Sequence, residues 1–487
     1  MDVNRRGIVW VKIGFFFVVV ELGILASANM VFRVQHKFHD HKRSLNALHS
    51  HDCHRHKRML AAAELPLGGD GSPTSAALYF TKIQIGSPPK DYHVQVDTGS
   101  DILWVNCIEC DSCPKKSDLG IPLALYDPKG SSSAKKVTCD NEFCKTTLDS
   151  GGTECKVGMP CLYTVTYGDG SGTAGYYVND NLQLLQASGD GETKYMSGNI
   201  TFGCGANQSG ELGSSEQALD GILGLGQSGS SPLSQFASAK KVKKTFSHCL
   251  SGSKGGGIFA IGEVMEPKVK TTPMLDDTTH YNVELKSIDV NGETLDIPKS
   301  IFDLVKKEGA IVDSGTTLAY FPAKVYNPLM EKIIAAQPDK KPQTVEKLFK
   351  CYQYSGNIDE GFPNVTFHFE DSLSLTVSPH QYFFEVEDDQ WCIGFQDSNI
   401  QSGAGGELTL LGDLLLSDRL VTYDIENKVI GWVDHDCSST IKVKDEESGN
   451  VYEVHADDIS SAHCTSHSRM ILGLLLFLAA TLINWTN

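Results

Sequence analysis

Two short stretches of this chain have nearly the same sequence, although they lie in different halves of it. They are residues 96–100 (VDTGS) and 312–316 (VDSGT). In each, an Asp follows an apolar run and precedes a turn made of a hydroxyl residue, a Gly and a second hydroxyl residue. An Asp at the end of a buried strand is costly to desolvate unless it is hydrogen-bonded or functional. Its presence in both stretches predicts two copies of one structural unit that bring Asp97 and Asp313 together.

A second repeat accompanies the first. Residues 221–226 (GILGLG) follow the first Asp stretch, and residues 408–413 (LTLLGD) follow the second. Glycine within a strand allows another backbone to approach closely. We therefore expect each apolar-apolar-Gly stretch to brace its Asp turn from behind.

The rest of the chain has the pattern of a mainly β protein. Short alternating apolar runs are separated by Gly, Ser, Pro and Asp turns. Helical patterns are few, and they cover residues 232–239, 323–336 and 414–419. With the repeated unit, this predicts an all-β, bilobal fold, in which residues 74–245 form an N-terminal lobe with Asp97 and residues 246–440 a C-terminal lobe with Asp313.

Both ends carry apolar runs. Basic residues precede the first and small residues follow it, so residues 1–28 are predicted to be a cleaved signal peptide rather than a transmembrane anchor. The run 470–483 is short for a membrane span of roughly 20 residues. Small residues and a polar spacer precede it, as in a GPI-attachment signal. We expect the lipid to be attached to Ser460, with Ser461 as the second candidate. Residues 441–460 are then a linker to the anchor, and residues 461–487 are the tail that is removed. The alternative interpretation of the apolar run is a tail-anchored helix.

Charge is unevenly distributed along the chain. The formal net charge is −18, but residues 29–65 hold seven basic residues against three acidic ones, and seven of the sixteen histidines. A metal-binding tract is one interpretation of this density. We favour a basic prosegment, residues 29–73, that lies on an acidic partner and is released when carboxylates become protonated. The acidic remainder argues against a nucleic-acid ligand.

A pair of adjacent carboxylates has a specific chemical use. The two cannot both be ionised at low cost, so one holds a proton and the pair titrates as a unit. A water between them is activated by the ionised oxygen, while the protonated partner polarises a carbonyl group. No cofactor or metal is required. We expect the hydroxyls of Ser100 and Thr316 to bond the outer carboxylate oxygens, and Thr98 and Ser314 to lock the two turns across the lobe boundary. Gly99 and Gly315 complete the predicted support of the pair.

These two turns, each with its apolar-apolar-Gly partner, make the chain resemble a pepsin-type aspartic protease from about residue 78 to 437. The resemblance implies catalysis by Asp97 and Asp313. It also implies a flap hairpin that closes over the substrate, with Tyr167 near its tip and a hydrogen bond to it from Trp104. Tyr167 as a plain strand aromatic is the alternative.

The cysteines narrow the resemblance. Seven of the fourteen crowd the stretch between Asp97 and the predicted flap, as in the atypical nepenthesin-like and nucellin-like proteases of plants. The chain also lacks room for the saposin-like insertion of typical plant members. A metal site is disfavoured, since no second Cys/His cluster follows at zinc-finger spacing. The resemblance implies six disulfides: Cys107–Cys110, Cys113–Cys204, Cys139–Cys161, Cys144–Cys155, Cys249–Cys437 and Cys351–Cys392.

The sequence thus predicts a secreted, GPI-anchored, monomeric aspartic endopeptidase on the extracellular face of the plasma membrane, with polypeptide substrates and acidic working pH. Acceptor sequons at Asn199, Asn207 and Asn364 fit this route. The alternatives are a non-catalytic binding or inhibitor protein on the same scaffold and a two-carboxylate glycosidase. Matched Gly turns disfavour the glycosidase.

Overall fold

The structure is a computed structural model that describes residues 30–36, 79–147, 155–167, 170–187, 193–215, 218–252, 256–298, 301, 309–346, 348–387, 389–401, 408–444 and 449–454. The predicted signal peptide, Ser460, Ser461, the tail 461–487 and the prosegment beyond residue 36 lie outside the described residues. Within those ranges, the helices are all too short or too polar to cross a membrane.

Each Asp turn belongs to the same arrangement of three strands, which we call an Asp unit. In the first, β9 (Gly221–Gly224) lies between β3 (Lys90–Asp97), to which it is parallel, and β4 (Leu103–Asn106), to which it is antiparallel. In the second, β26 (Thr409–Leu411) lies in the same way between β17 (Ala310–Val312) and β18 (Ala319–Phe321). The prediction of two copies of one unit is confirmed.

Two glycines explain why the apolar-apolar-Gly stretch recurs. A Cβ at Gly224 would lie 2.6 Å from the backbone N and O of Ile102. A Cβ at Gly412 would lie 2.3 Å from the carbonyl oxygen of Leu318. Because the obstructing atoms are backbone, no side chain fits at either position.

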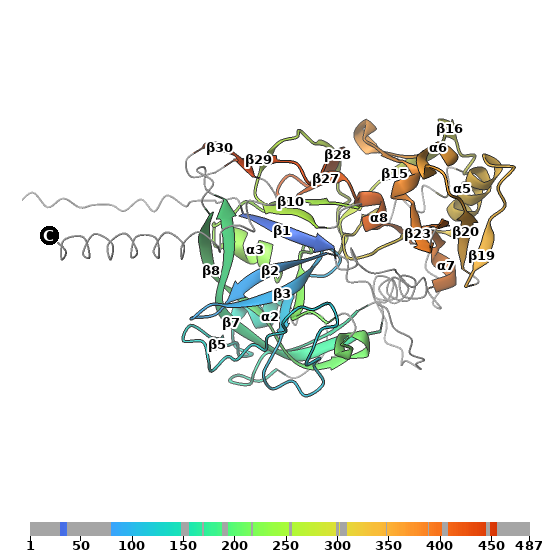
Figure 1. The fold of residues 1–487 in the computed structure, drawn as a ribbon. Coiled ribbons are helices and arrows are strands. Elements are labelled where there is room, and N and C mark those ends of the chain that lie inside the picture. Colours follow the sequence, from blue (N-terminus) through green and yellow to red (C-terminus); the bar gives the residue numbers. More distant parts are fainter. Residues whose placement is uncertain are drawn as a thin grey trace, which may run out of the picture.

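One sheet joins the two lobes (Figure 1). Its inter-lobe part has the order β13-β28-β27-β10-β11-β1 and continues through β2 into β3. The strands are β13 (Lys270–Pro273), β28 (Val429–Asp434), β27 (Arg419–Asp424), β10 (Thr245–Leu250), β11 (Gly257–Ile261), β1 (Met30–His36) and β2 (Tyr79–Ile85). Strands from both ends of the chain therefore meet between the lobes.

Strand β1 lies inside the predicted prosegment. It pairs antiparallel with β11 from Met30 opposite Ile261 to Val34 opposite Gly257, and its last two residues pair with β2. The first residues of the predicted prosegment are thus a strand of the inter-lobe sheet.

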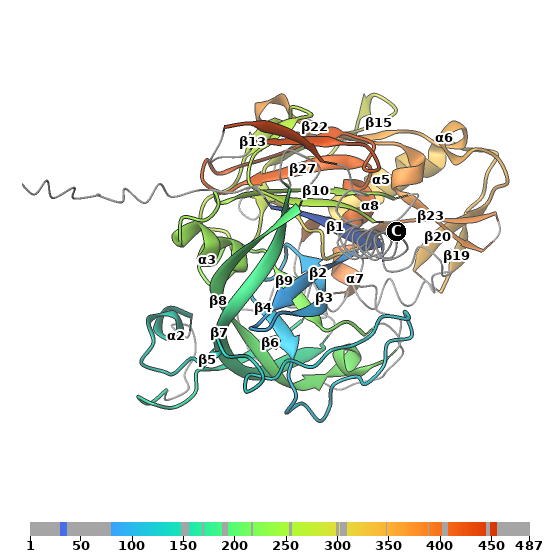
Figure 2. The same ribbon diagram turned by 60° about the vertical axis from the view of Figure 1, so that its left-hand side comes forward.

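The remaining strands complete the two lobes. In the first lobe they form hairpins, and the long pair β7–β8 crosses the lobe (Figure 2). These strands are β5 (Lys135–Lys136), β6 (Leu162–Thr166), β7 (Gly172–Ala187) and β8 (Thr193–Ser209). In the second lobe β14 and β25 extend the Asp unit, and two four-stranded sheets flank it. These strands are β14 (Asn282–Val283), β15 (Leu285–Val290), β16 (Glu293–Thr294), β19 (Gln343–Val345), β20 (Phe349–Gln353), β21 (Val365–Phe369), β22 (Ser374–Val377), β23 (Phe383–Glu387), β24 (Gln390–Ile393) and β25 (Phe395–Asp397).

Two of the three predicted helices are present. Residues 232–239 and 323–336 contain α3 (Pro232–Ser238) and α5 (Ala323–Ala335). The third prediction, 414–419, is wrong in extent: α8 (Asp413–Leu416) is a single turn. Arg419 is already in β27 opposite Asp434, because pairing in the inter-lobe sheet outweighs the local helical pattern. In the part of the chain that the structure describes, three short α-helices were not predicted: α2 (Glu142–Thr147), α6 (Ile358–Gly361) and α7 (Ser398–Gln401).

The predicted linker 441–460 begins with ordered structure. Strands β29 (Ile441–Lys444) and β30 (Val451–Val454) pair with each other, and β29 pairs with β12 (Val264–Glu266). The buried side chains of Ile441 and Val454 pack in a small core beside the Cys249–Cys437 disulfide. This part of the predicted linker therefore belongs to the folded body, because its apolar residues cover that core.

Candidate active site

The two Asp side chains are held by the same set of hydrogen bonds. Both are fully buried. In the first turn Gly99 N donates to Asp97 Oδ1 at 2.8 Å, and Ser100 Oγ donates to Asp97 Oδ2 at 2.5 Å.

In the second turn Gly315 N donates to Asp313 Oδ1 at 2.8 Å, and Thr316 Oγ1 donates to Asp313 Oδ2 at 2.8 Å. The backbone N–H two residues after each Asp, and the hydroxyl three residues after it, fix the two carboxylates alike.

The two turns are joined directly through Thr98. Ser314 N donates to Thr98 Oγ1 at 2.9 Å, and Thr98 Oγ1 donates to Asp313 Oδ1 at 3.5 Å. The expectation that Thr98 and Ser314 lock the turns is thus met by one side chain and one backbone group. Among the described residues the Ser314 hydroxyl has no hydrogen-bond partner, since the turn presents the Ser314 N–H to the other lobe instead.

The strand behind each turn holds its backbone. Leu225 N donates to the carbonyl of Asp97 at 2.8 Å, and Asp313 N donates to the carbonyl of Leu411 at 3.1 Å. The sequence prediction that the apolar-apolar-Gly stretches brace the Asp turns is confirmed.

The predicted flap is a β-hairpin. Strands β6 and β7 pair antiparallel, with Thr166 opposite Gly172, and Tyr167 N donates to the carbonyl of Ser171 at 2.7 Å across the turn. Trp104 Nε1 donates to the Tyr167 hydroxyl at 2.5 Å, and both side chains are buried. The expected hydrogen bond between the first Asp unit and this hairpin is present.

All twelve cysteines predicted to form disulfides do so, but four of the pairings are wrong. Cys249–Cys437 and Cys351–Cys392 are confirmed. The other four bonds are Cys107–Cys204, Cys110–Cys113, Cys139–Cys155 and Cys144–Cys161.

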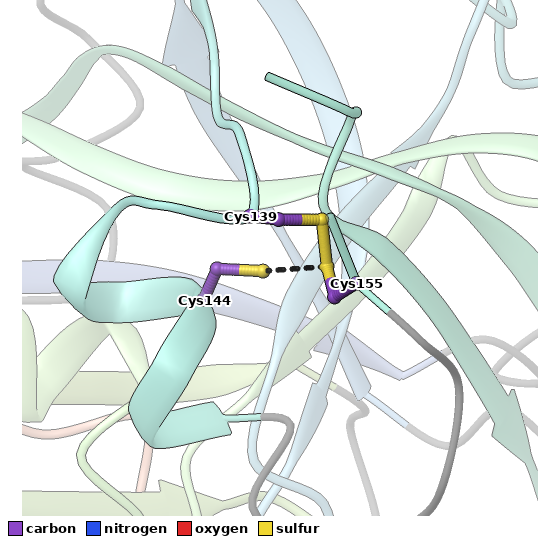
Figure 3. Close-up of side chains that lie close together, drawn as sticks. All are labelled: Cys139, Cys144 and Cys155. Carbon is purple, nitrogen blue, oxygen red and sulfur yellow. Dashed lines mark hydrogen bonds between the residues drawn. A yellow bond between two sulfur atoms is a disulfide. The ribbon is translucent and has the colours of Figure 1, made fainter. Parts of the chain in front are cut away.

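Figure 3 shows three of the four cysteines of the last two bonds, for which the pairing implied by the family resemblance is wrong. The sulfur of Cys144 lies 3.9 Å from that of Cys155, its predicted partner, while Cys155 is bonded to Cys139. Four cysteines in one small cluster give several feasible pairings, and only backbone geometry selects among them.

Two groups of possible metal ligands occur in the described part of the chain. They are Cys139, Cys144 and Cys155, and Cys107, Glu109 and Cys204. Every cysteine in both groups is in a disulfide and offers no thiolate, so neither group fits a metal ion.

Sequence reasoning missed two buried residues beneath the Asp turns, His248 and Tyr423. The Tyr423 hydroxyl lies 3.1 Å from His248 Nε2, and burial raises the pKa of its phenol well above the ordinary value. Burial lowers the pKa of His248 to about 3. No spacing rule marks them, because each is one residue in an otherwise ordinary strand.

The three predicted glycosylation acceptors, Asn199, Asn207 and Asn364, are all exposed. Access to solvent is a requirement for such sites in folded regions.

Comparison with known proteins adds to this geometry. Residues 79–263 and 280–434 match family models described as xylanase inhibitor N-terminal and C-terminal. Aspartic proteinase 39 of Arabidopsis thaliana is 50% identical, over 95% of this chain and 95% of its own length. Aspartic proteinase 36 of the same plant is 50% identical over 97% and 96%.

More distant similarities agree with these. Aspartic proteinase nepenthesin-2 of Nepenthes gracilis is 28% identical, over 76% of this chain and 79% of its own length. A solved structure described as edgp has a TM-score of 0.62 at 18% identity, and the match covers 84% of this chain and 95% of that one. At that identity the likeness shows the fold alone.

Proposed function

Since this chain belongs to the pepsin-type aspartic proteinase family, in its nepenthesin-like plant branch, we propose that it is an aspartic endopeptidase whose catalytic residues are Asp97 and Asp313. The observation that carries this proposal is the link through Thr98, which joins two identically bonded Asp turns. Plant relatives named aspartic proteinases, 50% identical over nearly their whole length, support it.

The geometry suits a water-activated cleavage. Each carboxylate already accepts a backbone N–H and a hydroxyl hydrogen, which fixes its plane and leaves fewer orientations for the shared proton. The ionised oxygen takes a proton from the water as it attacks the peptide carbonyl, and the protonated carboxyl donates to the carbonyl oxygen. The amine then leaves with a proton from the dyad. One shared proton must be retained, so activity falls at neutral pH.

The hairpin of β6 and β7 supplies the flap. The Trp104–Tyr167 hydrogen bond ties the residue before its turn to the strand that follows Asp97. A flap anchored in this way lies over the peptide and excludes bulk water, which strengthens the electrostatic interactions in the site.

The experiment for this function compares wild type with Asp97→Asn and Asp313→Asn on a peptide library at mildly acidic pH, with and without pepstatin. We expect cleavage by wild type, its loss in both variants, and inhibition by pepstatin. Both variants keep nearly the same side-chain shape and one acceptor oxygen, while the second oxygen is replaced by an NH2 group that cannot serve as acid or base. Cleavage by either variant at the wild-type rate would contradict the dyad.

The second candidate is a non-catalytic inhibitor on the same scaffold, because the matched family models are described as xylanase inhibitor domains. Such a protein has no need of two carboxylates held in matched turns. Inhibition of a xylanase by the purified chain, together with absence of peptide cleavage, would favour this candidate.

We also propose that the chain is a monomer held by a GPI anchor at Ser460 on the extracellular face of the plasma membrane, with polypeptides rather than nucleic acid as its partners. Six disulfides and three exposed sequons support passage through the secretory pathway. Treatment of intact cells with a phosphatidylinositol-specific phospholipase C should release the protein. Retention at the membrane would contradict the anchor.

A further inference from the structure

An aspartate, a histidine and a serine are hydrogen-bonded in series on one sheet of the second lobe. They lie on three neighbouring strands of the sheet β16-β15-β21-β22: Asp289 on β15, His368 on β21 and Ser374 on β22. His368 Nε2 is 2.8 Å from Asp289 Oδ2, and His368 Nδ1 is 3.1 Å from Ser374 Oγ. The dyad chemistry described above uses none of the three.

The hairpin of β21 and β22 fixes the contact between the histidine and the serine. His368 and Ser374 are directly opposite each other in this antiparallel pair. The turn between the strands holds Asp371 and Ser372 at φ 55° and 58°. Two consecutive residues with positive φ give a tight hairpin turn whose twist matches its strands, and such a turn sets the register. The carbonyl of Ser374 also accepts from Trp432 Nε1 at 2.8 Å, which holds the backbone of the serine.

The three side chains differ in their access to solvent. The exposed fraction of the side chain is 19% for Asp289 and 34% for His368, and Ser374 is classed among the exposed residues. Their neighbours on the same strands point the other way and are fully buried: Ile288, Phe367 and Leu375. The series therefore begins at a shielded carboxylate and ends at a hydroxyl that a small molecule can reach.

The charge on Asp289 decides the direction of the two hydrogen bonds. Burial acts to raise the pKa of Asp289, but hydrogen bonds from Thr294 and His368 outweigh burial and hold this pKa below its ordinary value. The ionised carboxylate can only accept, so the Nε2 that faces it carries the hydrogen of the neutral ring. Nδ1 is then an acceptor, and Ser374 Oγ donates to it. A histidine in this arrangement can withdraw the proton from a serine hydroxyl.

We propose that Ser374 is a nucleophile toward small activated esters, with His368 as its general base and Asp289 as the positioning residue for the imidazole. The observation that carries this proposal is the continuous series of two hydrogen bonds from the shielded carboxylate to the exposed hydroxyl. An ester with a good leaving group needs no acid to assist its departure, so activated esters are the class that this series can attack. The site is independent of the proposed function, because neither carboxylate of the dyad takes part.

The reaction has two steps. Ser374 Oγ attacks the ester carbonyl carbon while its proton passes to His368 Nδ1, and the π pair of the carbonyl moves onto its oxygen. When that pair re-forms the carbonyl, the leaving phenolate departs with the electrons of the broken C–O bond, and His368 releases the proton to solvent. Water then hydrolyses the acyl-serine, which yields the carboxylic acid and restores the hydroxyl.

The first test needs no substitution at the site. The full chain, as wild type and as Asp97→Asn, is treated with 4-nitrophenyl acetate, and acetylation of each serine is followed by peptide mapping. Ser439 is the internal reference: its Oγ is also 3.1 Å from a histidine nitrogen, Nε2 of His435, but it donates to the carbonyl of Asp436 at 2.6 Å. We expect Ser374 to be acetylated about 100-fold faster than Ser439 in both proteins, the contribution of a general base. Equal rates at the two serines overturn the proposal.

The second test removes the base. His368→Gln keeps a polar side chain on the sheet but has no basic nitrogen, so acetylation of Ser374 should fall to about the rate at Ser439. The matched control is His380→Gln, in which another histidine of the second lobe loses its contact of 2.8 Å with Asp359 Oδ2. The control should acetylate Ser374 at the wild-type rate. Unchanged acetylation of Ser374 in His368→Gln overturns the role of the histidine.

The third test concerns the positioning residue. Asp289→Asn removes the charge that keeps the ring hydrogen on Nε2, so acetylation of Ser374 should slow by about ten-fold or more. Asp289→Glu returns a carboxylate and should recover most of that loss, which a merely structural role of Asp289 does not predict. Equal rates in the two variants overturn its role. The comparison of Ser374 with Ser439 in wild type decides the proposal if a variant does not fold.

Discussion

The backbone N–H of Ser314 donates to the Oγ1 of Thr98 at 2.9 Å, although the two residues are 216 positions apart in sequence. This bond, with the longer one from Thr98 to Asp313, makes a single hydroxyl the junction between the two Asp units. The two Asp units, which come from distant parts of the chain, thus depend on one side chain for the alignment of the dyad.

Thr98→Val tests that junction. The variant keeps the shape of the side chain but leaves the Ser314 N–H buried without its acceptor. We expect the free energy of unfolding to fall by about 1–3 kcal/mol, the cost of an unsatisfied buried donor, and kcat to fall more than KM changes. Denaturant unfolding and steady-state kinetics measure the two effects.

The control for this variant is Thr344→Val, on the exposed face of β19. The free energy of unfolding of this variant should stay within about 0.5 kcal/mol of the wild-type value. Equal stability and kcat in Thr98→Val and wild type would show that the junction is not needed.

Gly412→Ala tests the brace behind Asp313. The new Cβ would meet the carbonyl oxygens of Leu318 and Thr316 at 2.3 and 2.6 Å, so the backbone of the second Asp unit must shift. We expect destabilisation of about 1–3 kcal/mol or more, with loss of activity.

Gly229→Ala is its matched control, because nothing lies within 4 Å of a Cβ there. Thermal unfolding should separate the two variants clearly. Similar melting temperatures would contradict the close approach at Gly412.

The buried His248 makes stability depend on pH. Its pKa is lowered from 6.5 to about 3 by burial, so between these values the unfolded chain binds a proton that the native state does not. The free energy of unfolding therefore falls as pH is lowered through this window, by up to about 1.4 kcal/mol per pH unit. His248→Gln should flatten this dependence, as measured by urea unfolding at several pH values. If the free energy of unfolding depends on pH equally in the variant and in wild type, His248 is not the source of this dependence.

The disulfides differ in the length of chain they close. Cys249–Cys437 spans 188 positions, whereas Cys110–Cys113 spans only 3. Replacing the first pair by Ser should cost about 2–5 kcal/mol, and replacing the second much less, because a long loop gains more unfolded-state entropy when it is opened. Denaturant unfolding of the two double variants checks the order. A larger loss from the short loop would show that native-state strain dominates.

Prediction from sequence succeeded where the signal was local. The Asp turns, the middle strands that brace them and the Tyr167 hairpin each follow from residues close together in the chain. The predicted helix 414–419 failed because Arg419 pairs with Asp434 in the inter-lobe sheet. The predicted linker failed in part because Ile441 covers a core that includes Cys249, far away in sequence.

By itself the sequence determined that two Asp units would exist, because each unit is encoded by a turn and a glycine that tolerate few alternatives. It also determined which twelve cysteines would be oxidised. Only the tertiary structure decided how Cys139, Cys144, Cys155 and Cys161 pair, that β1 enters the inter-lobe sheet, and that His248 and Tyr423 meet between neighbouring strands. Those outcomes depend on which strands meet, and the energy of such contacts resides in backbone pairing and burial between segments that no local pattern connects.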